Sequence, residues 1–332
     1  GMAYALLGLA RAARNLGELE EAEDALTQSL SLHRDIGNQI GQSETMATLG
    51  QLAIRQSRFQ EAEDLIQQSL SLMPETNRYG IAFGLGLLGW AKILTGRFDE
   101  AETLATESLA LFGDLGGRVR VVKLSVILAR AHLHAGEYGA ARIQAEAVVS
   151  LAREADYDRG VGYGKGVLGE VALVEAAFAQ AYQALQESLF TLKEATDDPW
   201  NLNQSAWLCL AARGLEHRHE AWQHVVSTLE GASQGQQFMP LMVALAGIAL
   251  LLADEGETER AVELYALALC HPFVANSRWF EDVVGRDIAA VTVNLPAERV
   301  AVLGERGQAR DLEATAAELL DCLLYTSDAA DD

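Results

Sequence analysis

An alanine recurs along this chain at an almost constant spacing. Consecutive members lie 40, 39, 40, 40, 40 and 40 residues apart, and the series is Ala22, Ala62, Ala101, Ala141, Ala181, Ala221 and Ala261. A period in this range indicates a solenoid, in which each repeat buries its apolar face by stacking on its neighbours. Because solenoids bind along an extended surface, a compact catalytic centre is not the first expectation.

Other columns keep the register of the alanine and define two helices in each repeat. Thirteen and twelve positions before it stand a leucine or isoleucine and a small residue, as in Leu49-Gly50. Apolar or small residues follow it at +4, +7 and +8, the spacing of one helix face. A break separates the two helices and is often a glycine two residues before an aromatic, as in Gly96 and Phe98. The pattern predicts an all-α chain of helical hairpins.

These columns resemble tetratricopeptide (TPR) repeats. The resemblance is carried by the turn, the second-helix alanine and the leucine–small pairs Leu49-Gly50, Leu88-Gly89 and Leu168-Gly169. It covers residues 2–280 as seven repeats of about 40 residues, longer than the usual period of about 34. It implies an α-solenoid, a right-handed superhelix of TPR-like hairpins. The long variant resembles the C-terminal TPR region of bacterial STAND-type ATPases and LuxR-type regulators.

Composition narrows the classes of partner. The formal charge of −22 disfavours nucleic-acid binding by this segment, since phosphate contacts need clustered Lys and Arg. Three cysteines without a pairing pattern favour a reducing compartment, and we expect a cytoplasmic protein. The apolar run of residues 238–253 is short for a membrane span and coincides with the first helix of repeat seven. We therefore expect a core helix there and no membrane partner.

The C-terminal part leaves the repeat register. Residues 281–321 resemble the helical end that follows TPR arrays in STAND-type and LuxR-type proteins, and a generic helical cap explains them equally well. Residues 322–332, CLLYTSDAADD, resemble a translated sequencing adapter, so we expect a non-native tail. Together with a start at Gly1 inside a repeat, this suggests a piece of a larger protein.

Several motifs that would suggest chemistry have simpler explanations. The strings Gly84/Gly86/Gly89 and Gly164/Gly166/Gly169 match a dinucleotide fingerprint, but they lie 80 residues apart in the same first-helix position, as packing residues would. His217, His219 and His224 with Glu216 and Glu220 have metal-like spacing and fall at a hairpin turn. Neither Cys209 nor Cys270 has both a base and an orienting acid at a recognisable spacing. We expect no catalytic residues, no metal and no cofactor.

The TPR resemblance implies that the first helices line a concave groove that binds partners. Candidate groove residues lie 18, 11 and 7 positions before the alanine, and they include Tyr4, Arg11, Arg55, Phe83, Trp90, Lys123, Arg130, His134 and Tyr163. Arg120, Lys123 and Arg130 share one helix face as a basic stripe. Arginine and aromatic side chains are favoured anchors in interfaces, although surface residues without a partner would give the same pattern.

Repeat seven differs from the others. Val243, Ala246 and Leu250 make its predicted groove face apolar, and such a face is expected to be covered by residues 281–321 or by a partner.

The sequence therefore predicts a non-catalytic TPR superhelix that binds a protein, a peptide or a small effector in its groove. In the first hypothesis it is the sensor region of a larger bacterial signalling ATPase or transcription regulator. In the alternative it is a stand-alone scaffold for a peptide or protein partner.

Overall fold

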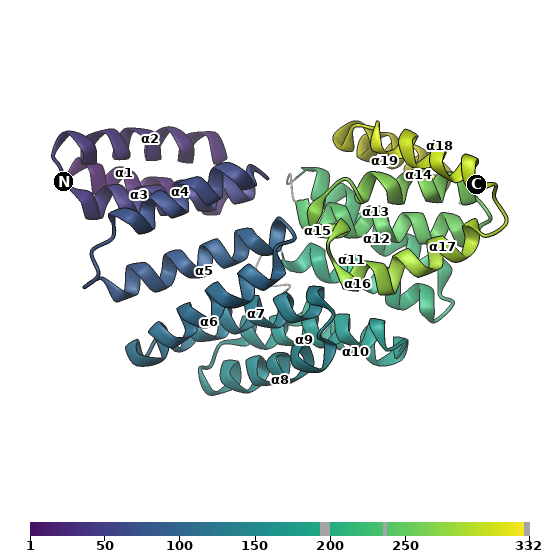
Figure 1. The fold of residues 1–332 in the computed structure, drawn as a ribbon, viewed down its shortest axis with the longest axis horizontal. Helices are drawn as coiled ribbons and strands as arrows, with labels where there is room; N and C mark the ends of the chain where they lie inside the picture. The colour runs from purple at the N-terminus through teal and green to yellow at the C-terminus, as the bar shows by residue number, and fades with distance from the viewer. Residues whose placement is uncertain (193–199, 235–237, 329–332) are drawn as a thin grey trace. The chain divides into compact units, whose positions relative to one another are not determined.

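The structure, a computed structural model, describes residues 1–192, 200–234 and 238–328 (Figure 1). These residues form helices joined by short turns and contain no strand. The first helices of the repeats are α1 (Met2–Leu16), α3 (Gln39–Arg55), α5 (Arg78–Leu94), α7 (Arg118–Ala135), α9 (Asp158–Val174), α11 (Trp200–Gly214) and α13 (Phe238–Asp254). The second helices are α2 (Leu19–Asp35), α4 (Phe59–Leu72), α6 (Phe98–Leu115), α8 (Tyr138–Glu154), α10 (Phe178–Leu192), α12 (Arg218–Gln234) and α14 (Thr258–Ala268). The predicted all-α solenoid of helical hairpins is confirmed.

First and second helices pack as hairpins, and successive hairpins stack. Consecutive first helices also contact each other directly: α1 with α3, α3 with α5, α9 with α11, and α11 with α13. The first helices therefore share one face of each stack, called here the first-helix face. At the centre of each hairpin lies the recurring alanine, which is fully buried in all seven repeats.

The turns inside the hairpins share a backbone conformation. The residue five positions before the recurring alanine has positive φ in every repeat: Gly17, Ser57, Gly96, Gly136, Ala176, Glu216 and Gly256. Glycine adopts this left-handed conformation without strain, whereas residues with a side chain do so at a cost. The turn geometry is thus conserved between repeats even where glycine is not.

A buried serine ties the two helices of a repeat together. In four repeats the serine seven residues after the recurring alanine donates a hydrogen bond to a first-helix carbonyl 26 residues earlier. The donors and acceptors are Ser29 to Ala3 O at 2.8 Å, Ser69 to Ser43 O at 2.7 Å, Ser108 to Ala82 O at 2.6 Å and Ser188 to Gly162 O at 2.6 Å. These bonds explain the serines of the +7 column, which helix periodicity alone did not explain.

Contacts divide the chain into two compact units, with the boundary inside α7. Unit 1 comprises residues 1–131, and unit 2 comprises the described residues from His132 onward. In unit 2 the apolar run of residues 238–253 forms α13, whose residues from Met239 to Leu252 are all buried, as expected of a core helix. None of the helices in the described part of the chain is both long and apolar enough to cross a membrane.

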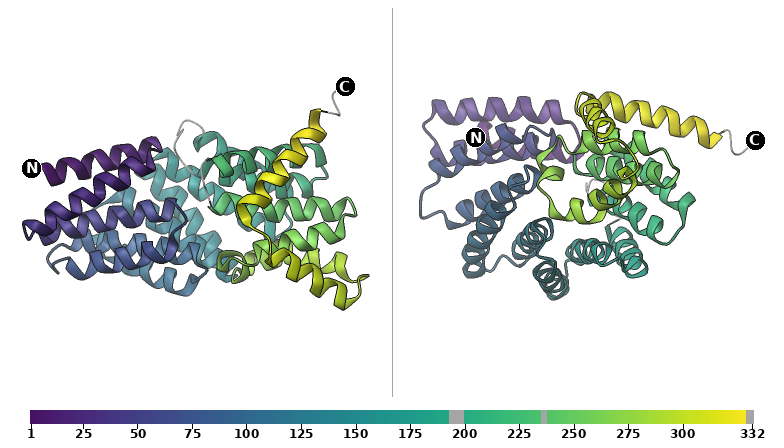
Figure 2. Two further views of the ribbon diagram at one scale, coloured as in Figure 1. Left: turned by 90° about the horizontal axis from the view of Figure 1, so that it is seen from above. Right: turned by 45° about the vertical axis from the view of Figure 1, so that its right-hand side comes forward.

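Beyond α14 the chain forms shorter elements and two further helices. These are α15 (Pro272–Ala275), α16 (Arg278–Phe280), the π-helical turn η1 (Glu281–Gly285), α17 (Arg286–Thr292), α18 (Ala297–Gln308) and α19 (Leu312–Asp328). Helices α17 and α18 pack on α14, and α19 packs on α12. The C-terminal end of α19 projects away from the rest of unit 2 (Figure 2).

The apolar face of repeat seven is covered from within unit 2. Val243, Ala246 and Leu250 are fully buried, and α13 contacts both η1 and α17. Of the two coverings expected from the sequence, residues 281–321 supply at least part.

Candidate partner-binding faces

In unit 2 the first-helix face is occupied by the chain itself. The segment of residues 272–285, called here the inserted segment, contains α15, α16 and η1. It contacts the C-terminal end of α7 through His134, α9 through Glu170, α11 through Trp207, and α13 through η1. Each of these partners belongs to a first helix, so the inserted segment lies where the sequence predicts a groove.

Aromatic packing holds the inserted segment in place. Phe273, Trp279 and Phe280 are all fully buried. The ring of Trp279 meets Trp207 edge-on at 4.2 Å between centroids, and Phe280 lies 5.3 Å from Trp279 and 5.5 Å from Phe273. Edge-to-face pairs at these separations contribute beyond the area they bury. The cluster is a hydrophobic core formed between the repeats and the segment that follows them.

Hydrogen bonds fix the register of the inserted segment. The Trp279 indole N–H donates to the Glu170 carbonyl oxygen at 2.9 Å. A hydrogen bond of 2.8 Å joins His134 Nδ1 to Ser277 Oγ, which also accepts from the Phe280 backbone N–H at 3.3 Å. Hydrogen bonds thus satisfy the Trp279 indole N–H, His134 Nδ1 and Ser277 Oγ inside the aromatic cluster, whereas the buried Trp207 indole N–H has no hydrogen-bond partner among the described residues.

Charged groups anchor the end of the inserted segment and the start of α17. Tyr138 Oη donates a hydrogen bond to Asp282 Oδ2 at 2.5 Å. Burial raises the pKa of Tyr138, and the hydrogen bond to the Asp282 carboxylate raises it further. Arg213 pairs with Asp254 and with Asp287, each at 2.7 Å. Tyr138 and Arg213 thus connect repeats four and six to residues that lie beyond the repeats, and Arg213 also joins repeat six to Asp254 of repeat seven.

Two predicted site residues lie in unit 2 and are buried there. His134 is fully buried between Ser277 and the rings of Phe273 and Phe280. Tyr163 is 7% exposed, with its ring 6.5 Å from that of Tyr157. Their contacts in this structure are internal, so a partner would reach them only after a rearrangement.

The other predicted site residues lie in unit 1. Arg55 is half-buried, as are Phe83, Trp90 and Arg120, whereas Lys123 is exposed and Arg130 is fully buried. The Arg120 guanidinium carbon lies 4.6 Å above the Phe83 ring, within the range of a cation–π contact. The predicted basic stripe of Arg120, Lys123 and Arg130 is not one continuous exposed surface, because its last member is buried.

Sequence reasoning missed two groups beside Arg55. Arg14 Nη1 donates to Gln51 Oε1, and Arg55 Nη1 donates to the Arg14 carbonyl oxygen at 2.7 Å. Gln51 lies eleven positions before the recurring alanine, in the same column as Arg11, and this position could have identified it as a groove residue. Arg14 lies one position outside the columns assigned to the groove.

The histidine-rich turn of repeat six forms a local hydrogen-bonded group. Glu220 accepts a hydrogen bond from Tyr182, and its oxygens lie 3.3 Å from His217 Nδ1 and 3.7 Å from His224 Nε2. The bond from Tyr182 lowers the pKa of Glu220, and burial lowers the pKa of His224. His219 instead contacts Gln223. Glu220 is thus engaged by protein groups.

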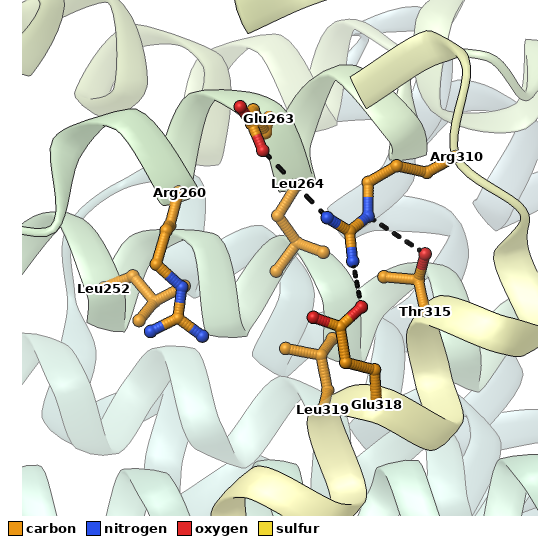
Figure 3. Close-up of a pocket in the computed structure, with 8 residues that line it drawn as sticks. All are labelled: Leu252, Arg260, Glu263, Leu264, Arg310, Thr315, Glu318 and Leu319. Atoms are coloured by element: carbon orange, nitrogen blue, oxygen red, sulfur yellow. Dashed lines mark hydrogen bonds and ion pairs between the residues drawn. The ribbon is translucent and has the colours of Figure 1, made fainter. Parts of the chain in front are cut away.

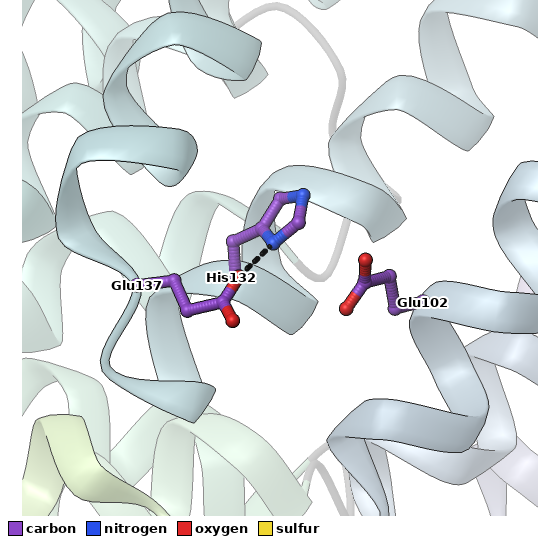
Figure 4. A group of neighbouring side chains, drawn as sticks. All are labelled: Glu102, His132 and Glu137. Carbon is purple, nitrogen blue, oxygen red and sulfur yellow. Dashed lines mark hydrogen bonds and ion pairs between the residues drawn. The ribbon is translucent and has the colours of Figure 1, made fainter.

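A second histidine–carboxylate pair lies at the turn of repeat four. His132 Nδ1 is 2.7 Å from Glu137 Oε2, and the two side chains point toward each other (Figure 4). Glu102, also drawn there, belongs to unit 1, and we assign no site to the three residues.

A small pocket lies where the C-terminal helices meet repeat seven (Figure 3). Its lining comprises Leu252, Arg260, Glu263, Leu264, Arg310, Thr315, Glu318 and Leu319. Arg310 crosses it, donating to Thr315 Oγ1 at 3.1 Å and pairing with Glu318 and with Glu263 at 4.0 Å. Because Arg310 pairs with both carboxylates of the lining, the pocket is best explained as the seam between the C-terminal helices and repeat seven.

The glycine strings and Cys209 are packing features. Gly84 and Gly164 lie inside α5 and α9, and a Cβ at Gly164 would stand 3.0 Å from the Ala145 carbonyl oxygen. Cys209 is fully buried, which raises the pKa of its thiol to about 12. Burial thus disfavours the thiolate, which is the nucleophilic form of cysteine.

Comparisons with known proteins agree with this architecture. Residues 1–75 match the family model described as a tetratricopeptide repeat. None of the curated proteins matches the sequence.

Solved structures resemble a much larger part of the chain. A Rap protein complexed with competence and sporulation factor has a TM-score of 0.65 at 13% identity, over 95% of this chain and 98% of that chain. NprR in complex with its cognate peptide NprX has a TM-score of 0.63 at 16% identity, over 86% of each chain.

A third structure is a STAND protein with a tetratricopeptide repeat sensor from Pyrococcus horikoshii. It has a TM-score of 0.54 at 14% identity, over 93% of this chain and 44% of that chain. Likeness at these identities concerns the fold. Together with the repeat columns and the hairpin geometry, it shows that the chain is a solenoid of TPR-like repeats.

Proposed function

We propose that this chain is a non-catalytic interaction module that binds a peptide or protein on the first-helix face of unit 1. One observation favours that location above others. The first-helix face of unit 2 is covered by the inserted segment, whereas Tyr4, Arg11 and Lys123 are exposed at predicted groove positions of unit 1. The solved Rap and NprR complexes, similar in fold, support a peptide as the partner.

The module belongs, in this proposal, to a larger bacterial signalling ATPase or transcription regulator of the cytoplasm. A peptide bound on this face would shift such a parent protein from its resting to its active state only if it binds the two states with different affinities. The STAND protein with a TPR sensor supports this context. A P-loop ATPase module encoded upstream of Gly1 would favour it, and the absence of one would favour the alternative, a stand-alone scaffold.

Peptide selection tests the binding function. Random twelve-residue peptides are displayed and selected on the full chain, and the affinities of selected peptides are measured by calorimetry. We expect Phe83→Ala and Trp90→Ala each to weaken binding at least tenfold, because aromatic anchors dominate interfaces.

Phe190→Ala is the matched control, since Phe190 is 81% exposed on α10, a second helix. Selected peptides whose affinity falls with Phe190→Ala and not with the unit 1 variants would contradict the proposed face.

A further inference from the structure

A buried ion-pair network lies at the joint between repeats two and three of unit 1. The Glu63 side chain, on α4, is only 2% exposed, and its Oε2 lies 3.0 Å from Nζ of Lys92 on α5, which is 6% exposed. The other oxygen of Glu63 pairs with Arg97 and accepts a hydrogen bond from Thr95 Oγ1 at 3.2 Å. Lys92 Nζ also lies 2.8 Å from an oxygen of Glu100 on α6. These five residues are called here the joint network.

The position of Glu63, one residue after the recurring alanine, makes polar contacts to the next repeat elsewhere in the chain. Four other second helices use it in this way, and the pairs are Glu23 with Arg58, Arg142 with Glu175, Tyr182 with Glu220 and Trp222 with Glu255. In the two ion pairs among these contacts, every side chain is at least 36% exposed. The joint network differs because its central pair, Glu63 and Lys92, is shielded from water.

Burial makes this central pair a weak source of stability. Removing a carboxylate and an ammonium group from water costs free energy that their attraction only roughly offsets, so apolar side chains of similar volume often hold a fold equally well. Ions supply geometry instead. Apolar contacts are non-directional, whereas charge-assisted hydrogen bonds require a narrow range of distances and angles. The joint network therefore selects one arrangement of α4, α5 and α6 among those that the apolar columns allow.

Helix α5 connects the joint network to the first-helix face. It carries Lys92 as well as Phe83 and Trp90, which lie at predicted groove positions. Because Lys92 follows Trp90 by two residues, the two side chains leave nearly opposite sides of the helix. Helix α5 also packs on α3, which carries Arg55. A shift of α5 would therefore move Phe83 and Trp90 together relative to Arg55.

We propose that Glu63 and Lys92 are positioning residues for the partner-binding face of unit 1. Their buried ion pair fixes α5 against the hairpin of α3 and α4, and thereby sets the spacing of the side chains that bind the peptide. The inference rests on the proposed function and adds what keeps its site in shape. Neither residue contacts the peptide.

The test replaces both buried ions with apolar side chains, Glu63→Met together with Lys92→Met. Arg97 and Glu100 are 36% and 53% exposed, so water can solvate them and no buried charge is left unpaired. We expect the urea midpoint to stay the same or to rise. The affinity of peptides selected on the unchanged chain should fall about tenfold, because ordering the face on binding then costs free energy. A merely structural role would lower the midpoint and the affinity together.

Electron paramagnetic resonance measures the spacing between repeats without a peptide. Spin labels are attached at Gln28→Cys on α2 and Glu107→Cys on α6, which are exposed and lie six residues after the recurring alanine of their repeats. Cys270→Ser and Cys322→Ser remove the exposed native thiols, and Cys209 is buried. The intact joint network should give one narrow distance distribution, and the double methionine variant should give a broader one.

Glu23→Gln is the matched control, because Glu23 occupies the equivalent position in repeat one and pairs with Arg58 at the surface. Exposed pairs contribute little, so this variant should change neither the affinity nor the distance distribution. The same substitution in the joint network, Glu63→Gln, should weaken peptide binding.

A double methionine variant that binds as tightly as the unchanged chain, or that keeps the narrow distribution, would overturn the positioning role and leave peptide binding standing. A urea midpoint that falls with the affinity would overturn it too, since the pair would then act through stability. Failure to select any peptide would count against the proposed function, and the distance distributions would still decide whether the joint network sets the spacing.

Discussion

At the scale of single residues, the turn column shows how backbone strain is distributed among repeats. Gly17, Gly96, Gly136 and Gly256 occupy the left-handed position in four repeats, and Ser57, Ala176 and Glu216 occupy it in three. A side chain in this conformation costs roughly 1–2 kcal/mol relative to the right-handed region. The three non-glycine turns are therefore local weak points in otherwise equivalent hairpins.

Exchanging residues at this column should move stability in opposite directions. Ala176→Gly should raise the free energy of unfolding by about 1 kcal/mol, because it removes the strain of a side chain at φ 54°. The greater entropy that glycine gives to the unfolded chain reduces this gain. Gly256→Ala should lower it by about 1 kcal/mol, since a Cβ there meets no atom within 4 Å and only the backbone term at φ 85° remains. Urea unfolding followed by circular dichroism measures both, and changes of the same sign would refute the explanation.

The serine column allows a second prediction at this scale. Ser108→Ala should lower the free energy of unfolding by about 1 kcal/mol, because it removes a fully buried hydrogen bond to the Ala82 carbonyl oxygen. Ser71→Ala is the control, since the exposed Ser71 hydroxyl bonds to Gln68 O within its own helix. Equal midpoints for the two variants would mean that the bond between helices adds nothing to stability.

At the scale of helices, glycines in equivalent positions are not equally required. A Cβ at Gly169 would stand 2.6 Å from Leu185 Cγ and 3.3 Å from the Ala181 carbonyl oxygen, whereas at Gly89 the closest atoms are 3.5 Å away. Helix α5 therefore has room for one more carbon at this position, and α9 does not. The sequence, which shows glycine at both, could not distinguish them.

This difference predicts opposite results for one substitution. Gly89→Ala should stabilise the protein by up to about 1 kcal/mol, because alanine is the better helix former and the new methyl group makes ordinary contacts. Gly169→Ala gains the same propensity but must displace Leu185, so it should be the less stable variant by at least about 1 kcal/mol. Thermal unfolding of the two variants side by side checks the order, and the reverse order would contradict it.

The limits of the sequence also appear at this scale. Regular hairpins were predictable because Ala22 and its equivalents fix the phase of every helix in a solenoid. The inserted segment was not predictable, since Phe273, Trp279 and Phe280 fall at the end of the last assigned repeat. Their partners lie up to 146 residues earlier, from Phe280 to His134. Periodicity in the sequence predicts contacts between neighbouring repeats, but it does not predict a segment that folds back across several repeats.

The candidate site shows the same limit. Arg55 was predicted because its column repeats, while Arg14 was missed because its neighbour in space, Gln51, is 37 residues away. The contact between Arg14 and Gln51 depends on the stacking of α1 on α3. Residue spacing along one helix cannot reveal it.

At the scale of the whole molecule, the inserted segment changes how unit 2 resists unfolding. In a simple solenoid each repeat contacts only its neighbours, and opening propagates from an end. In unit 2, one segment contacts α7, α9, α11 and α13 at once, through His134, Glu170, Trp207 and the helix–helix contacts of η1. Loss of its anchor should therefore loosen several repeats together.

Trp279→Ala tests this coupling. The variant removes a fully buried indole and its hydrogen bond to Glu170 O, so it should lower the free energy of unfolding of unit 2 by about 3–5 kcal/mol. Hydrogen exchange followed by mass spectrometry should show faster exchange in α9, α11 and α13, while the interiors of α1 to α4 keep the rates of the unchanged protein.

The matched control is Trp222→Ala, because Trp222 is a half-buried tryptophan of α12 that hydrogen-bonds Glu255 at 2.9 Å and lies outside the inserted segment's contacts. It should change exchange only near α12 and the turn after α13. Because the inserted segment holds several first helices together, Trp279→Ala should also affect helices that Trp279 does not touch, such as α10, which packs on α9. Faster exchange confined to the inserted segment would instead mean that it is a passive cover, and that the repeats of unit 2 are held by their neighbours alone.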